Sequence, residues 1–276
     1  MIPENTLESL SKAQAKTLKD RLKIEWTYRS NAIEGNTISL GDTAFIIEQG
    51  LTIKGKSIVE HTDIIGHAKA IDIIYELIAK NALTEDDIFL LHKAVQTAMI
   101  FDIMCPIGAY KVEPNGRYIK KNEKLEHAYY PMPNDMDHLM GLFFKEFGDT
   151  SKPLTTFDEC VTSYTDMHIA FSSIHPFFDG NGRLARLIAN IPLLKNGFLP
   201  IIISNEDRQE YIELLSTYNL HAPALDGASS CLIEKNSDYN KLYEFFKDQY
   251  KNSQVLLDEL RKSSSTSSFR ATTRNP

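Results

Sequence analysis

The chain has 276 residues, of which 42% are hydrophobic and 24% charged, a composition typical of one folded globular unit. Its net charge of −7 argues against nucleic-acid binding, because no basic face is indicated. The cysteines Cys105, Cys160 and Cys231 are widely spaced, which favours thiols in a reducing cytoplasm over a disulfide framework or a zinc site. No apolar run of membrane length and no signal-peptide pattern is present, so the sequence predicts a cytoplasmic protein without membrane contact.

The first predicted element is a long helix over residues 6–29, where apolar side chains recur at helical spacing. Gly35 or Asn36 is a natural helix stop, so Glu34 falls in the last turn. Glu34 could be a solvated charge, but a carboxylate at this end of a helix meets the negative pole of the helix dipole. Its position therefore suggests a cationic partner elsewhere in the chain.

Further helix starts are marked by Ser or Thr followed three residues later by an acid. Three pairs form such capping boxes: Ser57 with Glu60, Thr84 with Asp87, and Thr156 with Glu159. Two later stretches also have helical periodicity, residues 134–147 and 156–173. Because carboxylate or cysteine partners do not cluster with them in the sequence, we interpret four helical histidines as surface or core residues rather than metal ligands: His61, His67, His92 and His168.

The pattern changes between Met104 and Pro133, where Gly, Pro and Asn punctuate the sequence. Residues 117–120 and 126–130 are typical of two short strands, joined by a polar turn at 121–124. The sequence therefore predicts an all-α fold with one small β-hairpin.

The chemistry is concentrated in residues 175–186, which read HPFFDGNGRLAR. Gly180 and Gly182 flank Asn181 and permit a tight turn whose N–H groups point at one anion. Leu184 and the apolar residues after it recur at helical spacing, so the positive end of a helix dipole would face the same anion. This stretch predicts a phosphate-binding turn at a helix start.

Charged side chains surround the predicted turn. Arg183 and Arg186 lie near a helix start, where cations are disfavoured, and this cost is explained if they hold a polyphosphate. Asp179 suits Mg²⁺, which proteins bind through one or two carboxylates together with phosphate oxygens. His175 could take a proton from a hydroxyl. Each residue alone has an ordinary structural explanation, but together they indicate an active site.

The last third of the chain contains the remaining predicted elements. Pro192 is expected to interrupt the helix that begins at the turn. Residues 205–220 and 242–260 have the periodicity of two more helices. Residues 262–276 are rich in Ser and Thr and lack periodicity, which predicts a disordered tail.

The string at residues 175–186 resembles the motif of the Fic family, HxFx(D/E)GNGRxxR, at every fixed position. Ser30, Glu34 and Gly35 resemble the inhibitory motif of the same family, (S/T)xxxE(G/N). The resemblance implies the Fic fold, a helical bundle with a hairpin flap. It divides the chain into three parts: an N-terminal helix at 1–29, a Fic domain at 30–250 with its inhibitory segment at 30–36, and a C-terminal helix end and tail at 251–276.

The resemblance also implies roles for the matched residues. His175 would be the catalytic base, and Asp179 would hold Mg²⁺. Glu34 would pair with Arg186 and occupy the place of the ATP γ-phosphate. The nucleotide phosphates would contact Gly180, Asn181, Gly182, Arg183 and Arg186.

Two other parts of the site follow from the resemblance alone. Tyr211 and Asn219 would line the adenine pocket, although a tyrosine here is most often a core residue and an asparagine a cap. The flap would receive an extended target segment through Tyr118, Ile119 and Lys120. Lys111 stands where family members often have arginine, which concerns the anchoring of the flap.

From the resemblance we expect an autoinhibited protein adenylyltransferase that uses ATP and Mg²⁺ to modify a Ser, Thr or Tyr hydroxyl of a target protein. Self-modification and a homodimer are further expectations. The same residues could instead remove AMP with water activated by Glu34, or use another nucleotide or a phosphocholine donor. A regulatory nucleotide-binding module is a second class, but a pure binder needs neither His175 nor Asp179. A toxin of a toxin–antitoxin pair is a third, and the built-in inhibitory segment makes a separate antitoxin less necessary.

Overall fold

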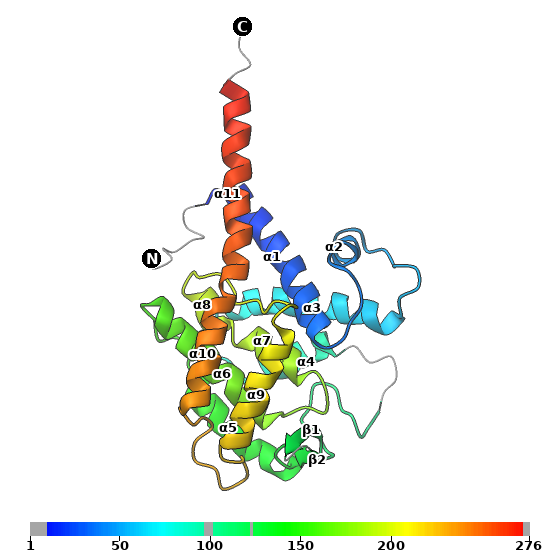
Figure 1. Ribbon diagram of the computed structural model, residues 1–276, viewed down its shortest axis with the longest axis vertical. Helices are drawn as coiled ribbons and strands as arrows, with labels where there is room; N and C mark the ends of the chain where they lie inside the picture. The colour runs from blue at the N-terminus through cyan, green and yellow to red at the C-terminus, as the bar shows by residue number, and fades with distance from the viewer. Residues whose placement is uncertain (1–9, 97–101, 122–123, 273–276) are drawn as a thin grey trace.

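The structure is a computed structural model that describes residues 10–96, 102–121 and 124–272 (Figure 1). The described residues form helices and a two-stranded antiparallel sheet, as the sequence predicts. The helices are α1 (Lys12–Ile33), α2 (Leu40–Gln49), α3 (Ile58–Leu77), α4 (Glu85–Val95), the 3-10 helix η1 (Pro133–Asp135), α5 (Met136–Phe147), α6 (Phe157–Ile174), α7 (Asn181–Ile188), α8 (Ile191–Lys195), α9 (Arg208–His221), α10 (Ser237–Gln249) and α11 (Lys251–Thr272). The strands are β1 (Gly116–Lys121) and β2 (Lys124–Tyr129).

Capping boxes begin four of the described α-helices, and the one at α1 is Ser11 with Gln14. The hydroxyl of Ser57 accepts the N–H of Glu60 at the start of α3, and Thr84 caps α4 in the same way. Thr156 with Glu159 begins α6 in the same way. The three boxes predicted from the sequence, at α3, α4 and α6, are confirmed.

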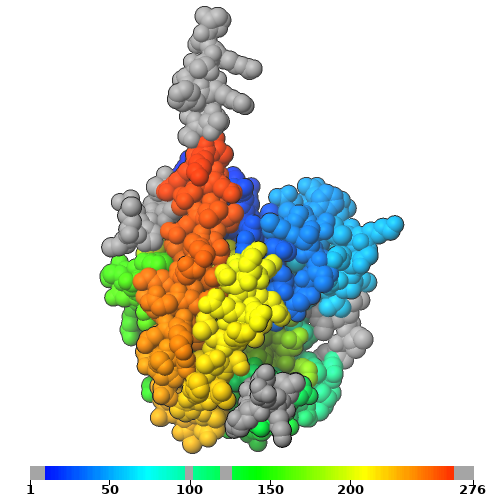
Figure 2. Space-filling view, viewed as in Figure 1, coloured from blue at the N-terminus to red at the C-terminus, as the bar shows by residue number. Residues whose placement is uncertain are grey.

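Helix α6 supports the active-site loop from within the core. It packs against α5, α7, α8 and α10. Short helix α7 follows the loop and is buried along nearly all its length, which fixes the loop from its other end. Figure 2 shows α9 beside α10, and α11 continuing from α10 toward the far end of the molecule. No helix among the described residues is both long enough and apolar enough to cross a membrane.

The four helical histidines are core residues. His61 and His92 are buried and hydrogen-bonded to backbone groups, and the buried ring of His168 contacts the hydroxyl of Tyr211. His67 is buried beside the Trp26 ring, and neither of its ring nitrogens has a hydrogen-bond partner among the described residues. In the described part of the chain, no group of three or more His, Cys, Asp or Glu side chains could hold a metal ion.

The first helix differs in extent from the one expected at residues 6–29. Helix α1 continues to Ile33, so the boundary expected after residue 29 falls inside a helix whose Leu18 and Trp26 are buried in the main core. Helix α2 was not predicted, although Ser39 caps its start and Gly50, with a φ of 67°, ends it. The predicted residues 6–9 of the first helix lie outside the described residues.

The C-terminal part also differs. Where one helix was expected at 242–260, the structure has two: α10 ends at Gln249 and α11 begins at Lys251, after Tyr250. Helix α11 continues to Thr272 and includes most of the segment expected to be disordered. In a helix that has already begun, Ser and Thr each cost only roughly 0.5 kcal/mol relative to Ala. The low apolar content of this segment is therefore not enough to end α11.

Candidate active site

The motif loop connects α6 to α7 through two residues in the left-handed backbone region. His175 has a φ of 53°, and it is the one residue other than glycine with a positive φ in the described part of the chain. That conformation costs about 1–2 kcal/mol for a residue with a Cβ, so the surrounding packing must hold it. Gly180 has a φ of 83°, and α7 begins at Asn181. The predicted turn and helix start are confirmed.

Asn181 closes the loop rather than pointing away from it. Its Oδ1 accepts the N–H of Phe177 at 2.9 Å, and its Nδ2 donates to the carbonyl of the same residue at 2.7 Å. Phe177 is buried and stacks on His92 with 3.8 Å between ring centroids. The Asn181 side chain is therefore occupied within the loop, and the groups left to contact a phosphate are backbone N–H groups at the start of α7.

His175 has the tautomer that a general base requires. Its Nδ1 lies 3.2 Å from the carbonyl of Ser172, which can only accept, so Nδ1 carries the proton and Nε2 has a free lone pair. Tyr130 stacks on the ring with 3.6 Å between centroids and 4° between planes. Burial, followed by the charges of Lys111 and Arg117, lowers the pKa of His175 to about 3.

The lowered pKa of His175 predicts that the rate of AMP labelling stays nearly constant as the pH falls. A base acts in its neutral form, and a lowered pKa keeps the imidazole of His175 neutral at lower pH. We expect the single-turnover rate of AMP labelling by Glu34→Gly protein, at saturating nucleotide and Mg²⁺, to change less than about twofold from pH 8 to pH 5.5. An imidazole with the ordinary pKa near 6.5 would lose about tenfold over that range. An acid limb centred near pH 6.5 would contradict the lowered pKa.

Arg186 is paired with the predicted inhibitory segment. The Glu34 carboxylate lies 2.6 Å from its Nη2, and Ser30 accepts from the same guanidinium through its hydroxyl at 3.1 Å and its carbonyl at 2.9 Å. Glu34 caps the end of α1, and Gly35 follows with a φ of 98°. A Cβ added to Gly182 would lie 2.6 Å from the Glu34 carboxylate, so glycine leaves room for this carboxylate over the start of α7.

Tyr211 lies behind Arg186 rather than in an open pocket. Its ring is buried, and its hydroxyl lies 3.5 Å from Nη1 of Arg186 and 3.0 Å from Nε2 of His168. Because the hydroxyl accepts from the guanidinium, it donates to His168, whose pKa burial lowers to about 3. The structure thus gives Tyr211 a supporting position for Arg186, away from the cavity that Asn219 lines.

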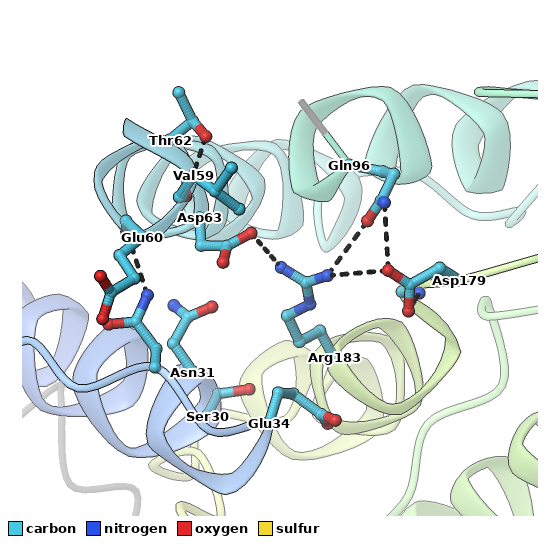
Figure 3. Close-up of polar contacts among 12 residues, drawn as sticks. Ser30, Asn31, Glu34, Val59, Glu60, Thr62, Asp63, Gln96, Asp179 and Arg183 are labelled. Carbon is cyan, nitrogen blue, oxygen red and sulfur yellow. Dashed lines mark hydrogen bonds and ion pairs between the residues drawn. The ribbon is translucent and has the colours of Figure 1, made fainter. Parts of the chain in front are cut away.

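Arg183 is held from both sides within the wall of the site (Figure 3). Its Nη1 donates to Asp63 of α3 at 2.7 Å, and its Nη2 donates to Oε1 of Gln96 at 3.0 Å. Gln96 Nε2 in turn donates to Oδ2 of Asp179 at 3.1 Å. Asp63 and Gln96 were not predicted as site residues. They precede Arg183 by 120 and 87 residues, and no motif in the sequence marks either position.

Asp179 fits the expected Mg²⁺ ligand. Its side chain is 65% exposed, and its Oδ1 accepts the N–H of Gly180 at 2.7 Å, which orients the carboxylate. The backbone carbonyl of Asp179 contacts His92 Nε2 at 3.2 Å, so the residue is fixed at both ends. A single oriented carboxylate beside a phosphate site matches the way proteins hold Mg²⁺.

A cavity of about 580 Å³ lies between β2, the end of α9 and the loop that follows α9. Tyr130, which stacks on His175, lines one side, and Asn219 lines another. The Asn219 side chain accepts from Ser173 Oγ at 3.0 Å and donates to the carbonyl of Leu215 at 2.9 Å. The volume falls in the range of small-molecule sites and the walls are mostly apolar and aromatic.

The predicted hairpin is present beside this cavity. Tyr118 pairs with His127, and the backbones of Ile119 and Lys120 pair with Glu126 and Leu125. In the described residues, β1 and β2 form no ladder with a third strand. Residues 122 and 123 of the predicted turn lie outside the described residues.

The segment before β1 ties the hairpin to the motif loop. The N–H of Lys111 donates to the carbonyl of Pro176 at 2.9 Å, and its Nζ donates to Asn115 at 2.8 Å. Asn115 in turn donates to the carbonyls of Phe177 and Phe178. Lys111 thus connects the hairpin to the motif loop, although family members often have arginine at this position.

The site combines a buried helix that starts at a glycine turn, the imidazole of His175 and a flanking hairpin, all within a mostly helical fold. Residues 82–193 match the model of the Fic/DOC family.

Named relatives agree with this family. The chain is 35% identical over 196 residues to "Protein adenylyltransferase Fic" of Nematostella vectensis, covering 70% of this chain and 42% of that protein. It is 31% identical over 198 residues to "Protein adenylyltransferase fic-1" of Caenorhabditis elegans, covering 71% and 36% respectively. The chain thus spans less than half the length of these curated relatives.

Solved structures share the fold across nearly the whole chain. A Fic domain containing signaling protein from Bacteroides thetaiotaomicron superposes with a TM-score of 0.76 and 25% identity, covering 93% of each chain. Fic-1 from C. elegans, residues 134–508, superposes with a TM-score of 0.70 and 25% identity, covering 95% of this chain and 69% of that one.

Proposed function

We propose that this protein is an autoinhibited protein adenylyltransferase, which transfers AMP from ATP to a Ser, Thr or Tyr hydroxyl of a target protein. The observation that carries the proposal is the position of His175. Its Nε2 lone pair is free, and its ring contacts Tyr130 in the wall of a cavity large enough for a nucleoside. The relatives named as protein adenylyltransferases support the same activity.

The proposed reaction is an in-line displacement at the α-phosphorus. His175 Nε2 takes the proton of the target hydroxyl, whose oxygen forms the new bond to the α-phosphorus. The bond from this phosphorus to the bridging oxygen breaks, and pyrophosphate leaves with the electron pair. Backbone N–H groups at the start of α7 are preorganised by the Asn181 contacts and stabilise the charge on the phosphates.

The remaining groups divide between phosphate and base. Arg183 and Arg186 would hold the phosphates that leave, and the Nε of Arg183 is buried without a partner among the described residues. Asp179 would hold Mg²⁺, which supplies positive charge to the phosphate oxygens when bound. Asn219 would contact the nucleotide base in the cavity, a role that Tyr211 does not share because it lies behind Arg186.

Autoinhibition is part of the proposal. Glu34 places a carboxylate on Arg186, over the helix start that would otherwise bind phosphate. ATP could then bind only in a pose unsuited to in-line attack.

The target is proposed to add as an extended strand beside Tyr118, Ile119 and Lys120, where backbone pairing gives affinity without a sequence requirement. Self-modification and a homodimer belong to the same proposal. So does a cytoplasmic location, which the free thiols of Cys105, Cys160 and Cys231 support.

The test incubates Glu34→Gly protein with a cell lysate, Mg²⁺ and nucleotides labelled at the α-phosphate. We expect ATP to label discrete protein bands and CTP, GTP and UTP to label them at least about tenfold less, since the base cavity reads the nucleotide. A phosphocholine donor labelled on its phosphate is included as the rival. Label from that donor, or from none of the nucleotides, would contradict the proposal.

A further inference from the structure

A chain of four polar side chains crosses the floor of the site from α3 to the motif loop (Figure 3). It runs from Asp63 through Arg183 and Gln96 to Asp179, with contacts of 2.7, 3.0 and 3.1 Å. Arg183 is almost fully enclosed, at 8% exposure, whereas Asp179 opens to the site. The chain therefore connects a buried cation to the exposed carboxylate expected to hold Mg²⁺.

The amide of Gln96 bridges these two charges. Its oxygen faces the guanidinium of Arg183 and its NH₂ faces the carboxylate of Asp179, the one orientation in which both contacts are favourable. Nη2 of Arg183 and Oδ2 of Asp179 also form an ion pair at 3.8 Å, a distance too long for a hydrogen bond. Gln96 also lies against the turn, since a Cβ added to Gly180 would come within 3.5 Å of its Oε1.

Asp63 satisfies the cation from the other side. Its carboxylate takes the short charge-assisted bond from Nη1 of Arg183. Without it, Asp179 would be the nearest carboxylate to this buried guanidinium and would be drawn into a full ion pair. A carboxylate neutralised in this way is a poorer ligand for a divalent cation, because the cation must then compete with arginine.

We propose that Gln96 and Asp63 are positioning residues that keep Arg183 from closing on Asp179 and so preserve this carboxylate for Mg²⁺. This inference rests on the proposed function of Asp179. The rival explanation makes Asp63 a second inhibitory carboxylate, which would compete with nucleotide phosphate for Arg183 as Glu34 does for Arg186.

Nucleotide binding, rather than turnover, tests the inference. Calorimetry measures the Kd of ATP with Mg²⁺ and with EDTA, in protein that carries Glu34→Gly and His175→Ala so that ATP can bind without transfer. The ratio of the two Kd values reports how strongly Mg²⁺ and ATP bind together. Adding Asp179→Ala gives the reference for complete loss of the carboxylate.

Gln96→Ala and Asp63→Asn are each expected to lower this ratio at least about fivefold, with Kd in EDTA changed less than about twofold. Asp63→Glu retains a carboxylate and should restore most of the ratio. Two matched controls should leave it unchanged: Asp72→Asn on the exposed side of α3, and Gln209→Ala on the surface of α9.

Three results would overturn the inference. One is an unchanged ratio in either Gln96→Ala or Asp63→Asn when thermal melting shows that variant to be folded. Another is a tighter Kd in EDTA for Asp63→Asn, which would make Asp63 a competitor of phosphate. The third is a failure of the protein with Glu34→Gly and His175→Ala to bind ATP, which would remove the proposed function together with the inference. ATP binding with an unchanged ratio of Kd values would remove the inference alone.

Discussion

Glu34→Gly protein is expected to transfer AMP, including onto itself, at least about tenfold faster than the unaltered protein, equivalent to about 1.4 kcal/mol of relieved competition. The reason is the 2.6 Å contact between this carboxylate and Arg186, whose side chain is only 4% exposed, so the ion pair is largely shielded from water. The measurement is the initial rate of labelling with α-labelled ATP at equal protein concentrations.

Two variants control this result. Glu48→Gly removes an exposed glutamate from α2, far from the contact, and should leave the rate unchanged. Adding Arg186→Ala to Glu34→Gly should abolish the gain, because it removes the phosphate ligand along with the partner of the inhibitor. Equal labelling by Glu34→Gly and unaltered protein would remove the autoinhibition and leave the catalytic assignment standing.

His175→Ala is expected to lower the transfer rate of Glu34→Gly protein by about 10²–10⁴-fold while the Kd of ATP changes less than about threefold. The base acts on the incoming hydroxyl, whereas the helix start and the arginines hold the phosphates. Calorimetry paired with the labelling assay separates the two effects. His138→Ala, which alters an exposed histidine on α5, is the matched control and should transfer AMP normally.

Persistent labelling by His175→Ala protein would assign the base elsewhere. A parallel loss of ATP binding would instead point to collapse of the loop, since this residue holds a left-handed conformation that alanine tolerates poorly. Circular dichroism of both proteins distinguishes an unfolded variant from an inactive one.

The site could be read from the sequence where its residues are close together. His175, Gly180 and Arg186 stand within twelve residues, and their order alone predicts a turn, a helix start and a phosphate ligand. The contact between Glu34 and Arg186 was also predicted, from the family resemblance and from the carboxylate of Glu34 at an unfavourable helix end. The expected cost of Arg186 near a helix start was wrong, because α7 is short and this residue lies in its last turn, where a cation is favoured.

Other parts of the site depend on tertiary packing and leave no local signal. Gln96 ends an ordinary amphipathic helix, and only the fold brings it to Asp179, 83 residues later. Tyr211 is a second example, since the resemblance assigns it to the nucleotide, whereas its hydroxyl contacts Arg186 and His168 in a way that the sequence does not indicate. Side-chain direction on a helix is fixed by its neighbours, which periodicity alone does not reveal.

The fold was predictable where hydrophobic periodicity and capping agreed. Helix α7 ends at Ile188 and α8 begins at Ile191, as expected from the interruption at Pro192. Helix α2 was missed because its ten residues are short for periodicity to stand out, although Ser39 and Gly50 marked both ends.

The packing of α1 in the core determines which movement can separate Glu34 from Arg186. Trp26 and Leu22 of α1 are buried in the main core, and Arg208 donates to the carbonyl of Ile33 at 2.7 Å beside the inhibitory glutamate. Undocking the helix would expose large apolar side chains at about 1.5–3 kcal/mol each. Rotating the Glu34 side chain, 43% exposed, breaks only its contacts to Arg186. Rotamer changes of exposed side chains take picoseconds to nanoseconds, whereas helix movements take microseconds or longer. If Glu34 inhibits as proposed, the protein would therefore reach its open state by a rotamer change, and its basal activity would be set by a rotamer population rather than by the lifetime of a closed domain.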